Sequence, residues 1–270
     1  MFRTNSLKTS LAGGKVGFGA LLGLGSSAVA ELCGQSGCDF VVVDGEHGLG
    51  DLATQFHCLQ ALAATPTTAI LRTDSTDPVA IKRALDMGPE AILVPDVRNA
   101  EQARAVVAAC RYPPRGVRGF AAPLVRASDY GWHTADYLSR VEDELMIIPM
   151  IESAEGARCA GAIASVEGID AVQFGPLDLA YDLGLGGDLT HDALHAVLNA
   201  AEQDIRAVGK PIGGPMLPGL SIRDMIGRGY RLLTVAFDTQ LLVQGLRTIL
   251  EQARTNEQAS TPSPPSKERL

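Results

Sequence analysis

The segment FVVVDGEH, residues 40–47, places three titratable side chains directly after four apolar ones. A charged group at the end of a buried strand is costly unless it has a partner or a ligand. Histidine exchanges protons near neutral pH, so His47 is a candidate general base, with Asp44 and Glu46 as candidate pocket residues. A histidine that only hydrogen-bonds the backbone of its own turn is equally common, and the segment leaves both interpretations open.

Two carboxylates further along the chain also follow apolar runs. Glu152 ends the run LMIIPMIE, and Asp178 ends the turn GPLD that follows the run AVQF. If these runs are neighbouring strands, the two side chains are candidate ligands of one cation. All-oxygen ligation suits Mg²⁺ or Mn²⁺ and tolerates Co²⁺ or Zn²⁺. The alternative is that Glu152 pairs with Arg158 or caps the next helix.

Arg72 ends the apolar run AILR, where a guanidinium needs an anion. We expect it to bind a substrate carboxylate or oxyanion, or to pair with Asp44 or Glu46. His191 and His195 have the spacing of a metal pair on a helix, but that helix is expected on the outside of the fold. We therefore interpret these two histidines as a solvated helix face.

The turn GPLD places Gly175 and Pro176 immediately before a helical turn. Backbone N–H groups at Leu177 and Asp178 are then free to hold a substrate carboxylate. A Schiff-base mechanism is disfavoured, because it needs a lysine at the end of a strand. The lysines of this chain do not meet that condition: Lys8, Lys15, Lys82, Lys210 and Lys267.

The elements that position these residues are predicted from a regular series of short apolar runs, which are continuous rather than alternating and so suit strands buried on both faces. Amphipathic stretches typical of helices separate most of them. The runs span residues 17–23, 40–46, 69–73, 91–96, 145–152, 171–176, 211–216 and 231–238. Eight strands alternating with helices predict a (β/α)8 TIM barrel, whose active site lies where the strands end. A doubly wound open sheet is the alternative, although GLGSSA after the first run matches its glycine fingerprint poorly.

A single barrel domain is expected over residues 1–255, followed by a disordered Pro/Ser-rich tail over 256–270. Residues 111–144 form an unusually long interval between two strands, which we interpret as a lid or a subunit contact. Thr190 and Ser221 are the expected N-caps of two late helices.

Composition excludes several classes of function. The 270 residues carry a net charge of −8 and no basic cluster, which argues against nucleic acid. No apolar run reaches the roughly 18 residues of a membrane span. The five cysteines lack zinc-type pairing and predict free thiols in a reducing cytoplasm. The segment VGFGALLGLGSSAVA imitates a signal peptide, but its glycines favour a first strand and the start of a helix.

From NSLK at residue 5 to about residue 250, the chain resembles the HpcH/HpaI family of class II 2-oxo acid aldolases. The resemblance rests on VVVDGEHG, ILRTDSTDPVAIKRALDMG, ILVPDVRNAEQA, YPPRGVRGF, IPMIESAEG and VEGIDAVQFGPLDLA, in the family's order and spacing. It implies a (β/α)8 barrel and a divalent metal that binds pyruvate or a similar 2-oxo acid and stabilises its enolate. It also implies a homo-oligomer, usually a hexamer, with a helix exchanged between subunits.

Carried over to matching positions, the resemblance implies that Glu152 and Asp178 are the metal ligands. His47 would be the base, and Arg72 would stabilise the oxyanion. The residues implied to contact substrate at the turn and beside it are Met150, Gly175, Pro176, Leu177 and Asp178.

The family also assigns to an acid, here Asp86, the task of raising the basicity of the histidine. A helix descending from the strand end would place Asp86 roughly 13 Å further down. If it reaches a His47, that histidine belongs to a neighbouring subunit; otherwise Asp86 is an ordinary exposed acid. Met150 stands where the family often has a glutamine that touches substrate, and GFGALLG replaces a tryptophan-containing segment. Both departures concern the identity of the substrate.

The expected activity is cleavage of a 4-hydroxy-2-oxo acid into pyruvate, or a related 2-oxo acid, and an aldehyde. A citrate-forming enzyme or a CoA-ester lyase would use the same metal and the same enolate chemistry. A protein that binds a 2-oxo acid or a metal without turnover is the alternative of a different class.

Overall fold

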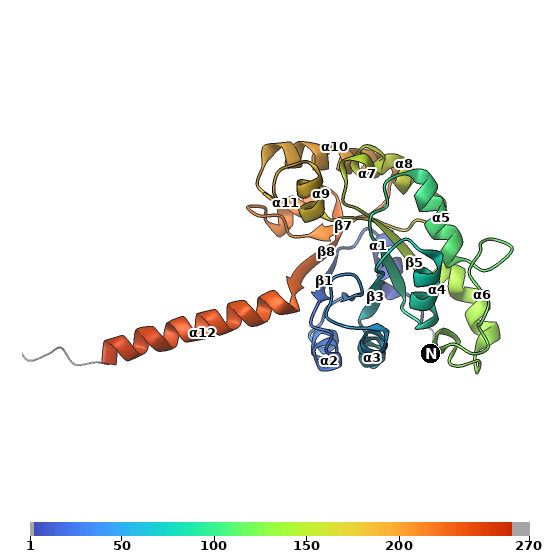
Figure 1. Ribbon diagram of the computed structural model, residues 1–270, viewed down its shortest axis with the longest axis horizontal. Helices are drawn as coiled ribbons and strands as arrows, with labels where there is room; N and C mark the ends of the chain where they lie inside the picture. Colours follow the sequence, from blue (N-terminus) through green and yellow to red (C-terminus); the bar gives the residue numbers. More distant parts are fainter. Residues whose placement is uncertain (1–2, 261–270) are drawn as a thin grey trace, which may run out of the picture.

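The computed structural model describes residues 3–260 and contains a closed barrel of eight parallel strands (Figure 1). The strands follow one another around the barrel in chain order, and β8 pairs with β1. They are β1 (Gly17–Leu22), β2 (Phe40–Asp44), β3 (Thr68–Arg72), β4 (Ala91–Val94), β5 (Met146–Ile151), β6 (Val172–Phe174), β7 (Ile212–Pro215) and β8 (Tyr230–Phe237). The predicted (β/α)8 barrel is confirmed, and closure by β1 and β8 rules out the open doubly wound sheet.

Helices surround this barrel, and polar side chains define where most of the longer ones begin. They are α1 (Ser6–Ala12), α2 (Ser27–Gln35), α3 (Leu52–Ala63), α4 (Pro78–Asp86), α5 (Ala100–Cys110), α6 (Thr134–Glu144), α7 (Ala154–Arg158), α8 (Ala160–Ala164), α9 (Pro176–Asp182), α10 (Asp192–Val208), α11 (Ile222–Gly227) and α12 (Asp238–Ser260). The expected N-cap Ser221 forms a capping box with Asp224. The expected N-cap Thr190 is wrong. His191 caps α10 instead, because its Nδ1 accepts from the N–H of Ala193 at 3.1 Å.

Alternation along the strands separates two apolar layers. One fills the inside of the barrel and includes Phe40, Val42, Ile70, Leu93, Ile148, Met150 and Leu232. The other lies between the strands and the helices and includes Val41, Val43, Leu71, Ile92, Ile147, Ile151 and Leu233. Strands buried on both faces explain why the sequence shows continuous apolar runs.

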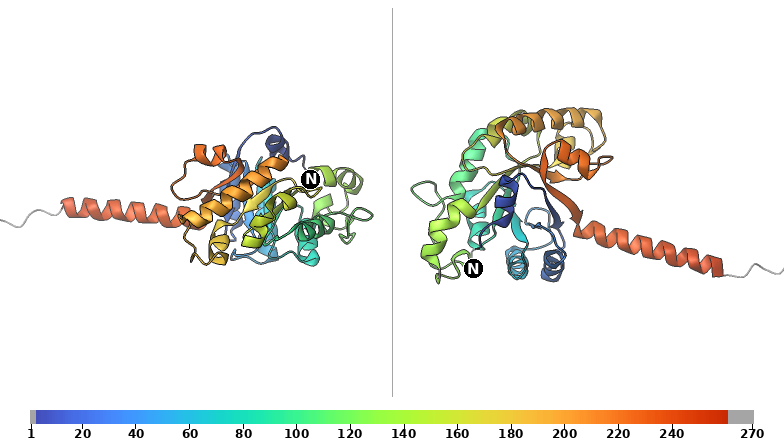
Figure 2. Two further views of the ribbon diagram at one scale, coloured as in Figure 1. Left: turned by 90° about the horizontal axis from the view of Figure 1, so that it is seen from above. Right: turned by 180° about the vertical axis from the view of Figure 1, so that it is seen from behind.

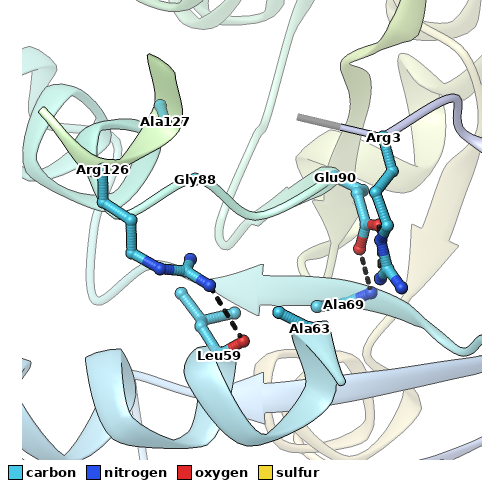
Figure 3. Close-up of a pocket in the computed structure, with 8 residues that line it drawn as sticks. All are labelled: Arg3, Leu59, Ala63, Ala69, Gly88, Glu90, Arg126 and Ala127. Atoms are coloured by element: carbon cyan, nitrogen blue, oxygen red, sulfur yellow. Dashed lines mark hydrogen bonds and ion pairs between the residues drawn. The ribbon is translucent and has the colours of Figure 1, made fainter. Parts of the chain in front are cut away.

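A small cavity of about 30 Å³ lies beside the start of β3, and Figure 3 shows that residues of α3 and of the segment before β4 line it. Arg3 donates to Glu90 Oε1 at 2.6 Å, and the other carboxylate oxygen accepts from the N–H of Ala69 at 2.7 Å. Arg126, on the other side, donates to the carbonyl oxygens of Met87 and Leu59. A space of this size holds about one water molecule.

Residues 111–144, expected as one long loop, contain a helix. A 3₁₀ turn (Arg126–Ser128) is followed by α6, which buries Tyr137 and Val141 against the body. Val117, Phe120, Leu124 and Trp132 are exposed in the rest of this segment. Its function as a lid or subunit contact stays a prediction.

The last helix, α12, leads away from the barrel instead of packing on it (Figures 1 and 2). It reaches Ser260, so residues 256–260 are helical and the expected start of the disordered tail at 256 is wrong. The rest of that predicted tail, 261–270, lies outside the described residues. Between residues 3 and 260 no helix combines the length and apolarity needed to cross a bilayer.

A close approach between β1 and β2 generates the first prediction. A Cβ on Gly19 would lie 2.4 Å from the carbonyl oxygen of Phe40 and 2.5 Å from its ring. We expect Gly19→Ala to lower the free energy of unfolding by about 2 kcal/mol or more, measured by urea denaturation. Gly227→Ala is the control, because no atom lies within 4 Å of its added carbon. Equal stability of the two variants would contradict the close packing of this seam.

Candidate active site

A buried ion pair joins the ends of β2 and β3. Asp44 and Arg72 are register partners on these strands, and only 4% and 8% of their side-chain surfaces are exposed. Arg72 donates through Nε to Asp44 Oδ1 at 2.8 Å and through Nη2 to Oδ2 at 2.6 Å. Of the two roles that the sequence allows Arg72, pairing with an internal acid is therefore present in the structure. Two parallel bonds also fix the plane of the guanidinium.

The turn after β2 wraps around the same carboxylate. Asp44 Oδ1 accepts from the backbone N–H groups of Glu46 at 3.0 Å and His47 at 3.2 Å. Burial alone would raise the pKa of Asp44, but Arg72 and these two N–H groups hold it below its ordinary value. Glu46 Oε2 lies 2.9 Å from Arg72 Nη1. Burial nevertheless raises the pKa of Glu46, and Arg72 only partly offsets it.

Glu152 lies at the end of β5 and faces the same group of charges. Its side chain is buried, and its Oε1 accepts from the N–H of Asp96 at 2.8 Å. Asp96 has a left-handed φ of 50°, which an L-residue adopts only when its surroundings require it. Burial, followed by the negative charges of Glu46 and Asp178, raises the pKa of Glu152 to about 7. Neither alternative for Glu152 is present among the described residues: it forms no ion pair with Arg158, and Ser153 caps the following helix α7.

The turn between β6 and α9 brings Asp178 toward Glu152. A Cβ on Gly175 would lie 2.7 Å from Glu152 Oε2 and 2.6 Å from the methyl carbon of Met150, so only glycine allows this approach. Pro176 begins α9, and no described side chain caps its first N–H groups. Leu177 and Asp178 occupy this first turn, as the sequence predicts.

The donor set suits a hard divalent cation. Among residues 3–260 no three His, Cys, Asp or Glu side chains are arranged to hold an ion. Glu152 and Asp178 would therefore share the ion with water and substrate oxygens, which is the usual ligation of Mg²⁺. A cation would also offset the repulsion among Glu46, Glu152 and Asp178, which raises the pKa of Glu152.

His47 is accessible at this mouth, with 67% of its side chain exposed. Its Nε2 lies 3.9 Å from Glu46 Oε2. Asp86, at the end of α4, instead accepts a hydrogen bond from Arg118 Nη2 at 2.8 Å, and the Arg118 side chain is fully buried. Asp86 is therefore not a free surface acid, and no contact between it and His47 of the same chain is recorded.

Two buried polar residues were not anticipated from the sequence. Gln173 on β6 and Thr234 on β8 lie inside the barrel below the charged mouth. The alternation of side chains along a strand could have indicated that Gln173 points into the barrel. It lies two residues from both Ala171 and Gly175 and therefore shares their inward face.

The barrel is closed and parallel, and carboxylates, an arginine and a histidine lie at the carboxyl ends of its strands. This is the arrangement of a (β/α)8 enzyme. The family model "HpcH/HpaI aldolase/citrate lyase" matches residues 19–244. The chain belongs to this family of carbon–carbon lyases.

Individual relatives cover nearly the whole chain. The 4-hydroxy-2-oxo-heptane-1,7-dioate aldolase of Salmonella arizonae is 38% identical over 245 residues, 91% of this chain and 93% of its own. The crystal structure of an HpcH/HpaI aldolase/citrate lyase family protein from Burkholderia cenocepacia J2315 is 32% identical, with a TM-score of 0.88, and covers 93% of this chain and 100% of its own. The citrate synthase SbnG is 27% identical, with a TM-score of 0.84, and covers 94% and 99%.

The buried pair at the mouth generates a stability prediction. Asp44→Asn removes the negative charge that faces the buried guanidinium of Arg72, and Glu46 is then its remaining ion-pair partner. We therefore expect the free energy of unfolding to fall by about 3 kcal/mol. Glu167→Gln is the control, because Glu167 is 87% exposed beside Arg115 and an exposed pair contributes little. Urea denaturation of both variants measures the difference. A loss in Asp44→Asn no greater than in the control would contradict this interpretation of the pair.

Proposed function

We propose that this protein is a divalent-metal-dependent class II aldolase. Its substrate would be a 4-hydroxy-2-oxo acid, which it cleaves to pyruvate, or a related 2-oxo acid, and an aldehyde. The observation that carries the proposal is the convergence of Glu152 and Asp178 beside Arg72 at the barrel mouth. The relative from Salmonella arizonae, named as an aldolase of such an acid, supports the same chemistry.

Each residue of the mouth has a distinct task in this reaction. A divalent ion at Glu152 and Asp178 would supply Lewis-acid polarisation of the 2-oxo group. The uncapped N–H groups at the start of α9 bind the substrate carboxylate. His47 accepts the proton of the 4-hydroxyl group, and the hydroxyl-bearing carbon becomes the aldehyde as the C3–C4 bond breaks.

The electron pair of that bond moves toward the 2-oxo oxygen, where negative charge develops. Arg72 is positioned to stabilise this charge, because Asp44 and Glu46 fix its guanidinium while occupying only some of its five N–H donors. Preorganisation matters here, since a freely rotating arginine would have to reorient during the reaction.

A citrate-forming reaction is the second candidate, supported by the similarity to citrate synthase SbnG. It would use the same metal ligands and the same developing negative charge, with oxaloacetate as one reactant. A CoA-ester lyase would differ in the leaving group. A 2-oxo acid binder without turnover remains the non-enzymatic alternative, and a location in the cytoplasm stays a prediction.

We also propose that α12 packs on a second copy of this chain, within a homo-oligomer such as a hexamer. Leu242, Leu246 and Ile249 are more than half exposed on this helix. The helix leads away from the barrel in both figures, whereas the last helix of a (β/α)8 barrel ordinarily covers the outer face. Exposed apolar residues on α2 and β8, Leu32 and Val235, offer a surface for the helix of another copy.

The metal-dependent reaction has a direct assay. With Mn²⁺ or Mg²⁺ we expect pyruvate release from a panel of 4-hydroxy-2-oxo acids, abolished by EDTA. Glu152→Gln should lower kcat/KM by about a hundredfold or more, because it removes an anionic ligand. Glu155→Gln, an exposed acid three residues later, is the matched control and should leave the rate unchanged.

Other outcomes of this assay separate the alternatives. Cleavage that survives both EDTA and Glu152→Gln would overturn the metal-dependent mechanism. Consumption of oxaloacetate without cleavage of any 4-hydroxy-2-oxo acid would favour the citrate-forming reaction. Calorimetric binding of pyruvate without any turnover would favour the binder.

The exposed helix makes a prediction about assembly. We expect the wild-type protein to be an oligomer by light scattering at micromolar concentration. Leu246→Glu combined with Ile249→Glu should shift it to smaller species, because two charges would be buried in an apolar contact. Gln252→Glu adds a charge elsewhere on the helix and serves as the control. A wild-type protein that is a monomer under these conditions would overturn the proposed packing.

A further inference from the structure

Two polar side chains are buried in an otherwise apolar part of the barrel interior. Gln173 pairs in register with Met150 on β5 and with Gly213 on β7, and Thr234 lies on β8. Only 4% of Gln173 and 2% of Thr234 is exposed. Their neighbours on the inner face include Ile148, Met150 and Leu232.

One polar atom of each side chain lacks a hydrogen-bond partner in the described part of the chain. Gln173 Oε1 and Thr234 Oγ1 are buried there without one. A buried acceptor that loses water and gains no donor destabilises the protein by about 1–3 kcal/mol. A ligand that brings a donor to this part of the barrel interior would complete the hydrogen bonding of the Gln173 oxygen.

The position of Gln173 relates it to the proposed active site. Gly175 directly follows β6 and is the next inward position after Gln173. A Cβ added to Gly175 would lie 2.7 Å from Glu152 Oε2. Gln173 is therefore one layer below the metal-ligand candidates. Its amide leans across β7, because an added Cβ on Gly213 would lie 3.2 Å from Oε1. The absence of a side chain on Gly213 leaves space for the amide group of Gln173.

We propose that Gln173 is a specificity-determining residue, which favours a 2-oxo acid with a hydroxyl group on C3 over pyruvate. This inference rests on the proposed aldolase function. The unpartnered atom is an acceptor, so the ligand must bring a donor. At neutral pH, pyruvate offers only carboxylate and ketone acceptors, whereas a C3 hydroxyl group both donates and accepts. Thr234, which also both donates and accepts, complements the same hydroxyl from β8.

The test compares 3-hydroxypyruvate with pyruvate. Exchange of C3 hydrogens with deuterated water, followed by NMR in the presence of Mn²⁺-loaded protein, reports on both acids without an aldehyde. We expect wild type to favour 3-hydroxypyruvate by about tenfold in kcat/KM, the ratio expected from one hydrogen bond to a buried group. Gln173→Met, which keeps the length of the side chain, should abolish this preference by lowering kcat/KM for 3-hydroxypyruvate. Thr234→Val should reduce the preference as well.

Gln203→Met, on the exposed face of α10, is the matched control and should retain the wild-type ratio. If Gln173→Met does not fold, Thr234→Val and the ratio of the wild type itself still decide the question. Two outcomes would overturn this inference and leave the proposed function standing. One is that both variants exchange pyruvate and keep the wild-type ratio of kcat/KM for 3-hydroxypyruvate to that for pyruvate. The other is that the wild type exchanges pyruvate but shows no preference for 3-hydroxypyruvate. Absence of exchange with either acid would overturn the proposed function and the inference with it.

Discussion

The buried pair between Asp44 and Arg72 organises the mouth of the barrel. It joins β2 to β3, orients the guanidinium, and uses the same carboxylate to hold the backbone turn that carries Glu46 and His47. A single buried arginine nevertheless faces more acids than it can neutralise, because Glu46 and Glu152 both add negative charge near it. The excess is the electrostatic reason why a bound cation would suit this site.

Backbone geometry brings the remaining acids to this mouth. Gly175 lets the turn before α9 approach Glu152, and the left-handed Asp96 turns its N–H toward the same carboxylate. Both features lie in loops that follow strands, where the barrel permits changes without disturbing the packed interior. The barrel mouth therefore combines one left-handed residue with one close approach of the backbone to a buried acid.

The sequence was informative where local pattern determines structure. Continuous apolar runs predict strands buried on both faces, and the charges that end them predict the mouth. Prediction failed where distant contacts decide. The sequence did not indicate that Asp86 accepts a hydrogen bond from Arg118, thirty-two positions away, and its role toward a His47 of a neighbouring subunit stays a prediction. His191 replaced Thr190 as a cap, because the Thr190 hydroxyl and N–H bond instead to Asp188. The direction of α12, which leads away from the barrel, is likewise not encoded in the local pattern of the helix.

Different strands contribute the charged mouth and the uncharged layer below it. Asp44, Arg72 and Glu152 come from the ends of β2, β3 and β5, whereas Gln173, Gly213 and Thr234 lie within β6, β7 and β8. A change in the lower layer therefore leaves the ion pair and the candidate metal ligands in place. Met150 approaches both, because its methyl carbon lies 2.6 Å from the position of an added Cβ on Gly175, beside Glu152, while its backbone is in register with Gln173. A thioether at this position cannot donate a hydrogen bond, whereas the amide of its register partner Gln173 both donates and accepts.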